Sequence, residues 1–169
     1  MNLKDTINED IKSAMKSGLN DEASALRFLN SVIKNKELEK RNRLSKESAS
    51  WRTLAELEKL SELVDEEVIN VILGEIKKRK ESIAQYEKGG RKDLAEKETS
   101  ELEILKKYVP EEMSEDELRG AIKRKLVEMG EISAKDFGRI MGSVMAEVKG
   151  RAGGMTVKRI IEEEMKNET

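Results

Sequence analysis

The sequence predicts an all-α protein, with an N-terminal helical domain over residues 1–109 and a small three-helix module over residues 110–169. Aromatic residues make up only 3% of a chain that is rich in Glu and Lys, and this composition favours helices over strands. The 169 residues include a single proline, the residue that helices tolerate least. Apolar residues also recur every three or four positions, the spacing that lines one face of an α-helix.

Two helices are predicted at the N-terminus. Residues 3–15 place an apolar side chain at every fourth position, and Gly18 can end this helix. Asn20 or Asp21 can cap the second helix. Its apolar stripe is expected to contain Leu26, Leu29, Val32, Ile33 and Leu38. Residues 36–50 are dense in charge and serine, and two interpretations stay open for them: a solvated helix end or a mobile connection.

Three further helices are predicted before Pro110. The first should turn an apolar face inward, made of Trp51, Leu54, Leu57, Leu60 and Leu63. Asp65 opens the longest pattern, which continues to the glycine pair at residues 89–90. The last helix must end at or near Val109, because proline disfavours helical backbone at the preceding residue. Pro110 is therefore the predicted domain boundary.

The C-terminal module carries the sharpest local signals. Ser114 and Glu117 have capping-box spacing, and Gly130 follows the helix that they open. Ser133 can cap a second helix, with Asp136 at its third position. A glycine-rich turn then leads to the last helix. The apolar faces of the three helices are predicted to hold Leu118, Ile122, Leu126, Phe137, Ile140, Met141, Val144, Met145, Val148, Val157, Ile160, Ile161 and Met165.

The turn KGRAGG, residues 149–154, is the most unusual segment of the chain. Its glycines allow close approach of a ligand to the backbone, and the helix behind them offers free N–H groups. Six basic residues against two acidic ones give residues 135–159 a local charge of +4, in a chain of net charge −2. The basic residues are Lys135, Arg139, Lys149, Arg151, Lys158 and Arg159, and the acidic ones are Asp136 and Glu147.

Cations beside open backbone amides are what binding to a sugar-phosphate backbone requires. The alternative is that the glycines make a tight turn between packed helices, with Lys and Arg as a solubilising surface. The segment is not a nucleotide P-loop, because G-x-x-x-x-G-K-[ST] is absent.

Other functions find little support in the sequence. The chain has no cysteine and no histidine, so thiol chemistry, the commonest general base and the commonest metal ligand are missing. Acidic runs such as residues 65–67, 111–112 and 162–164 are interpreted as solvated or helix-capping faces. We therefore predict no catalytic residues, no metal and no cofactor. No apolar stretch approaches transmembrane length or resembles a signal peptide, so a cytoplasmic location without a membrane partner is expected.

Two long segments of the chain resemble a known family. Residues 65–118, with the run EKGGRKDLAEKE and the YVP boundary, resemble the YqeY proteins. Residues 136–165, with FGRIMG and KGRAGG, resemble their C-terminal module, which is similar to the tail of the B subunit of the glutamyl/aspartyl-tRNA amidotransferase. The shared unit is called the GatB/YqeY domain. The resemblance implies an all-helical fold with a small C-terminal domain of this type.

In the amidotransferase the similar tail recognises the tRNA body, while other domains perform the amide transfer. The resemblance therefore implies a tRNA-facing site. Its candidate residues, with Arg159 added from the basic cluster, are Arg139, Gly142, Lys149, Gly150, Arg151, Gly153, Gly154, Lys158 and Arg159. A carbon–nitrogen ligase label, with glutamine as amido-N-donor, would be inherited from the domain without its chemistry.

Two hypotheses for function follow. In the first, the chain is a non-catalytic accessory protein that binds tRNA. In the second, it is a protein–protein adaptor that binds an aminoacyl-tRNA synthetase or an amidotransferase. A stand-alone amidotransferase is disfavoured because no catalytic residues can be assembled. The sequence does not rank the first two hypotheses.

Overall fold

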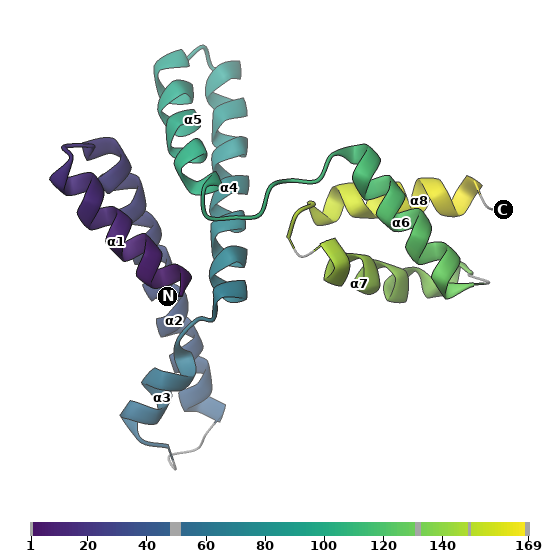
Figure 1. Cartoon of the computed structure of the whole chain (residues 1–169), viewed down its shortest axis with the longest axis horizontal. Helices are drawn as coiled ribbons and strands as arrows, with labels where there is room; N and C mark the ends of the chain where they lie inside the picture. The colour runs from purple at the N-terminus through teal and green to yellow at the C-terminus, as the bar shows by residue number, and fades with distance from the viewer. Residues whose placement is uncertain (1, 48–51, 131–132, 149, 168–169) are drawn as a thin grey trace. The chain divides into compact units, whose positions relative to one another are not determined.

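The computed structural model describes residues 2–47, 52–130, 133–148 and 150–167. Every regular element in these ranges is a helix, so the all-α prediction is confirmed. The chain divides into two compact units, Met1–Val109 and Pro110–Thr169 (Figure 1). Each unit has a hydrophobic core of its own.

The first unit consists mainly of two helical hairpins. Its helices are α1 (Leu3–Lys16), α2 (Asn20–Glu47), α3 (Leu54–Ser61), α4 (Asp65–Lys88) and α5 (Lys92–Lys106). Figure 1 shows α1 lying along α2 and α5 lying along α4. Each hairpin turns at a glycine with positive φ, Gly18 at 72° and Gly90 at 71°, a conformation that glycine adopts without steric cost.

The core of the first unit joins α1, α2, α4 and α5. Its buried side chains are Ile7, Leu29, Ile33, Leu63, Val68, Ile72, Ile76, Leu102 and Leu105. Three predicted core residues are instead exposed, namely Leu38 at 47%, Leu54 at 66% and Leu60 at 48%. For the two on α3 the reason is that, in the described part of the chain, α3 packs against α2 alone and buries only its Leu57 side. Trp51 lies outside the described residues.

The charged stretch after residue 36 is helical as far as Glu47, where α2 ends. Its side chains also make tertiary ion pairs: Lys40 Nζ lies 2.8 Å from Glu67 of α4, and Arg41 Nη1 lies 3.0 Å from Glu58 of α3. Glu37 pairs with Lys4 of α1 at 2.6 Å. This part of the stretch is therefore a helix end tied to its neighbours, and residues 48–50 lie outside the described ranges.

The second unit is a three-helix module. It contains α6 (Glu115–Met129), the short 3₁₀ helix η1 (Ala134–Asp136), α7 (Phe137–Val148) and α8 (Gly154–Asn167). The predicted capping box is confirmed, because Ser114 Oγ accepts from the Glu117 N–H at 3.3 Å and Glu117 Oε2 accepts from the Ser114 N–H at 2.9 Å. This exchange satisfies two of the backbone donors at the start of α6.

All three helices contribute to the core of this unit. The buried side chains are Leu118, Ile122, Leu126, Ile140, Val144, Val148, Val157, Ile160 and Ile161. Phe137 and five methionines pack at its edge and are partly buried, namely Met113, Met129, Met141, Met145 and Met165. The core thus fixes which sides of α7 and α8 remain available to a ligand.

Candidate nucleic-acid interface

The glycine-rich turn begins directly after α7. Gly150 has φ of 78°, in the left-handed region that favours glycine. The Arg151 N–H donates to the Val148 carbonyl at 2.8 Å, which closes the turn over the end of the helix. The predicted site residue Lys149 lies outside the described residues. Gly150, the first glycine of the turn, is therefore needed for the positive φ that the turn requires.

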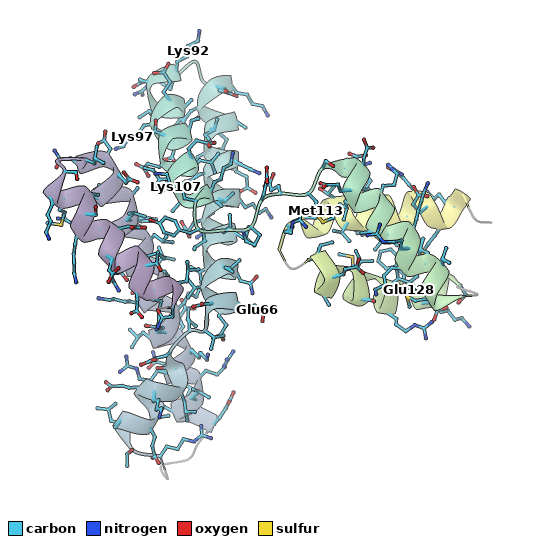
Figure 2. All side chains as sticks on the ribbon, viewed as in Figure 1. Glu66, Lys92, Lys97, Lys107, Met113 and Glu128 are labelled. Atoms are coloured by element: carbon cyan, nitrogen blue, oxygen red, sulfur yellow. The ribbon has the colours of Figure 1, made fainter. Side chains whose placement is uncertain are left out.

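Arg151 fastens this turn to the segment that precedes α6. Its Nε–H donates to the Glu111 carbonyl at 3.1 Å, and its own carbonyl accepts from the Met113 N–H at 2.8 Å. Met113 is labelled in Figure 2 on that segment. The Arg151 side chain is half-buried. Arg151 thus has a structural role that the sequence interpretation did not foresee.

Open backbone donors lie at the start of α8. The first hydrogen bond of this helix runs from the Val157 N–H to the Gly153 carbonyl at 3.0 Å. The N–H groups of Gly154, Met155 and Thr156 precede that bond, so they have no acceptor within the helix. They also carry the partial positive charge of a helix N-terminus. These backbone N–H groups at the start of α8 can therefore donate hydrogen bonds to an anionic oxygen.

Arg139, Gly142 and Lys158 are exposed on α7 and α8. The Arg139 side chain is 62% exposed and its Nη2 lies 3.2 Å from Asp136. The Lys158 side chain is 53% exposed and its Nζ lies 3.9 Å from Glu162. A Cβ added at Gly142 would meet no described atom within 4 Å, so this glycine leaves open surface on α7. These exposed pairs are weak, and a polyanion can compete for both cations.

Arg159 is placed differently from the other candidates. Its guanidinium pairs with Glu115 of α6 at 2.8 Å and with Glu163 at 2.7 Å. Arg119 of α6 joins the same network, at 2.8 Å from Glu163 and 2.5 Å from the buried Glu164. Arg159 therefore stabilises the contact between α6 and α8, and a phosphate would have to displace two carboxylates to reach it.

The charge of +4 counted along residues 135–159 is not the charge found around these residues in space. Arg139, Lys158 and Arg159 each have a carboxylate within 4 Å. Of these carboxylates only Asp136 belongs to that segment, because Glu162 and Glu163 follow it on α8 and Glu115 lies in the acidic first turn of α6. Contacts in the folded unit thus neutralise part of the cluster, and the side chains of Arg139 and Lys158 are more exposed than that of Arg159, which is 48% exposed.

The ion-pair network shifts the pKa values of its members. Hydrogen bonds from Arg159 and then from Arg119 hold the pKa of Glu115 below its ordinary value. Hydrogen bonds from Arg119 and then from Arg159 do the same for the pKa of Glu163. The pKa of Glu117 is lowered by the Ser114 N–H and hydroxyl of the capping box. All three carboxylates are therefore held in their charged form in the folded unit.

We expect the second unit to lose stability as the pH falls below 4.5, the ordinary glutamate pKa. Because folding lowers these pKa values, the stabilisation is complete above 4.5 and is lost as the pH falls through the folded values. Thermal unfolding followed from about pH 7 to about pH 3 should show the melting temperature of this unit falling by several degrees. In Glu115→Gln/Glu163→Gln the fall should be smaller. An equal fall in both proteins would contradict this account of the network.

The acidic runs have the structural roles that the sequence predicted, with one exception. Asp65 accepts from the Leu3 N–H at 2.9 Å and Glu67 caps the start of α4. Glu164 is the exception, because it is only 5% exposed and is held by Arg119. Among the described residues, no group of three or more acidic side chains is arranged to hold a metal ion. None of the described helices is both long enough and apolar enough to cross a membrane.

Several known proteins are similar to this chain. An uncharacterised protein of Schizosaccharomyces pombe is 40% identical over 99 residues, which are 54% of this chain and 80% of that protein. A Clavispora lusitaniae protein named "Altered inheritance of mitochondria protein 41, mitochondrial" is 31% identical over 86% of this chain and 74% of its own length. A protein of the same name from Pyrenophora tritici-repentis is 36% identical over 52% of this chain. The chain spans only 49% of that relative.

These names contradict the predicted cytoplasmic location. The relatives from Clavispora lusitaniae and Pyrenophora tritici-repentis are named as mitochondrial proteins, as is one from Kluyveromyces lactis. The prediction was wrong because it rested on the lack of an apolar segment. Such a lack argues against a secretory signal or a membrane span, but it does not distinguish one aqueous compartment from another.

The family comparison agrees with the resemblance seen in the sequence. A match to the Yqey-like protein family covers residues 48–165. This range includes α3 to α5 of the first unit and, in the second, α6, α7 and α8 as far as residue 165. It also contains both segments on which the resemblance rested. Because the match covers well over half of its residues, the chain belongs to the YqeY family.

Proposed function

We propose that this protein is a non-catalytic accessory protein that binds tRNA through the α7 and α8 surface of its C-terminal unit. The supporting observation is that the exposed cations Arg139 and Lys158 share this unit with the amides at the start of α8 that have no acceptor within the helix. The similarity of the C-terminal module to the tail of the amidotransferase B subunit supports tRNA as the nucleic acid. A ligase label would belong to that enzyme's other domains.

The proposed contacts involve fewer residues than the nine candidates. Gly150 and Arg151 shape and fasten the turn, and Arg159 is held by two carboxylates. The residues left to contact phosphate are Arg139, Gly142, Gly153, Gly154 and Lys158, with Lys149 in the same turn by sequence. Three or so phosphate contacts would give a slope of roughly −2 to −3 in log affinity against log salt.

Charge reversal on this surface tests the proposal. We expect Arg139→Glu/Lys158→Glu to weaken binding of a labelled tRNA by at least about tenfold at about 50 mM salt, because two phosphate contacts are replaced by repulsion. Fluorescence anisotropy at several salt concentrations would measure both the affinity and the salt slope. Arg151→Glu is a poorer test, because it would also release the turn from the Glu111 carbonyl.

A control with the same change of charge is available on the same unit. Arg124 and Lys166 are exposed, on α6 and near the end of α8, and neither is a candidate site residue, although Arg124 Nη2 lies 3.8 Å from Glu147 of α7. Arg124→Glu/Lys166→Glu should retain binding to within about threefold, since it alters net charge without removing the proposed contacts. Equal losses in the two double variants would show non-specific attraction, and unchanged binding in both would refute the assigned surface.

A protein–protein adaptor for a tRNA-charging or amidotransferase complex is the second candidate. It is supported by exposed apolar side chains on α2, α3 and the residue before α4 of the first unit, namely Leu38, Leu54, Leu60 and Val64. Exposed apolar side chains of this kind suit contact with another protein. A partner such as a synthetase or an amidotransferase that stays bound after nuclease treatment and at high salt would favour this function over tRNA binding.

A further inference from the structure

A polar cavity lies among α2, α4 and α5 of the first unit, apart from the C-terminal site. Its volume is about 360 Å³, within the usual range for small-molecule sites. The side chains that matter for its chemistry are Phe28, Glu75, Lys78, Arg79, Glu98 and Glu101. Figure 2 shows side chains along the α4 and α5 hairpin that contributes most of them. Charged groups therefore gather in a pocket that is open to solvent and lies beside the apolar core of this unit.

Arg79 is the first unusual feature of this cavity. It is only 8% exposed, and its Nη1 lies 2.8 Å from Glu98 and 2.6 Å from Glu101. Its Nε is buried without a hydrogen-bond partner in the described part of the chain. Burying a charged group in this way is costly unless the surrounding structure compensates for it. Two carboxylates around one guanidinium leave this cluster with an excess negative charge.

Glu75 is the second unusual feature. It lies one helical turn before Arg79 on α4 and is only 6% exposed. Its carboxylate pairs at 2.7 Å with Lys78 Nζ, but the Lys78 side chain is 72% exposed. A cation held on a flexible, solvated chain can be replaced by another cation at little cost. Glu75 is thus a buried carboxylate whose present partner is exchangeable.

An ion pair that only joined α4 to α5 would not need all of the charged groups in this cavity. The pairs from Arg79 to Glu98 and Glu101 suffice to join α4 to α5. They do not require Glu75, nor a cavity beside them, nor the half-exposed Phe28, whose ring centroid lies 5.6 Å from Arg79 Cζ. Lys78 is exposed and exchangeable, so only Arg79 is a fixed cation beside Glu75, Glu98 and Glu101. A bound cation would offset part of this excess negative charge.

We propose that this cavity binds a small organic cation, a primary ammonium or guanidinium group carried on a short aliphatic chain. The cationic group pairs with Glu75 in place of Lys78, close to the excess charge of Glu98 and Glu101. The aliphatic chain lies against the Phe28 ring, which favours a neighbouring cation or methylene group. The same chemistry could be supplied by a free diamine or by the basic side chain of a peptide.

Titration of the full chain followed by NMR tests this site. Two probes distinguish the sources of the cation: 1,4-diaminobutane for a free amine, and Nα-acetyl-arginine amide for a peptide side chain. Saturable shifts at amides of α2, α4 and α5 around Phe28, Glu75 and Glu98 are expected with at least one probe. The absence of a saturable shift with either probe up to about 10 mM would overturn the proposal.

Three variants make the result specific to the cavity. Glu75→Gln should weaken binding at least about tenfold, because it removes the charge that the cation meets at nearly constant shape. Lys78→Ala should tighten binding, because it removes the competing ammonium from an exposed position. Glu103→Gln is the control, since it removes one carboxylate from an exposed site on α5 that pairs with Lys106. Equal affinities for Glu75→Gln and Glu103→Gln would overturn the proposal.

Discussion

Replacing Ile160 by alanine is expected to destabilise the second unit by about 2–5 kcal/mol, because it leaves a cavity in a closely packed core. Ile160 of α8 is fully buried among side chains of α6 and α7. A unit of this size has a total stability of the same order, so the substitution should leave much of it unfolded. The first unit has a separate core and should stay folded.

Hydrogen exchange measured by mass spectrometry would resolve this outcome by segment. Protection should be lost across α6, α7 and α8 and retained across α1, α2, α4 and α5. Met155→Ala, at a side chain that is 79% exposed on the same helix, should leave protection unchanged. Loss of protection in both units of Ile160→Ala would show that the two units unfold as one.

Replacing Arg79 by leucine is expected to destabilise the first unit by about 3–5 kcal/mol. Arg79 is nearly buried, and its removal leaves Glu98 and Glu101 facing one another on α5 without their shared cation. Removing one partner of a buried ion pair is more damaging than removing both, because the remaining charge has lost its solvation. Urea denaturation followed by circular dichroism would measure the change.

Two further variants separate this effect from the loss of any surface arginine. Arg91→Leu removes a cation that is 59% exposed and pairs with Asp93, and it should leave the urea midpoint nearly unchanged. Adding Glu98→Gln and Glu101→Gln to Arg79→Leu should recover part of the lost stability, because the uncompensated charges are then gone. A midpoint for Arg79→Leu equal to that of Arg91→Leu would show that the buried cluster does not stabilise the fold.

Local signals in the sequence predicted the helices well. Gly18, Gly90 and Gly130 all have positive φ near a helix end, and Ser114 with Glu117 forms the expected capping box. Such signals act within a few residues along the chain, so they can be recognised without knowledge of the tertiary structure. The apolar faces of α6, α7 and α8 were predicted for the same reason.

The burial of charged side chains was predicted less well than the burial of apolar ones. Glu75, Arg79 and Glu164 are buried, although nothing in a chain that is 40% charged distinguishes them from their exposed neighbours. Leu54 and Leu60 show the converse error, because helical spacing identifies an apolar face without showing whether another helix covers it. In both cases, whether a side chain is buried depends on packing against a different helix, which the local sequence does not specify.

The amino-acid sequence by itself determined that the chain is helical, where most helices begin and end, and that it belongs with the YqeY proteins. Only the tertiary structure decided which cations of the glycine-rich region are available to a ligand. Glu115 of α6 neutralises Arg159 across 44 residues, and the Glu111 carbonyl holds Arg151 across 40. The physical reason is that Coulomb and hydrogen-bond energies depend on distance in space, which folding sets, and not on separation along the chain.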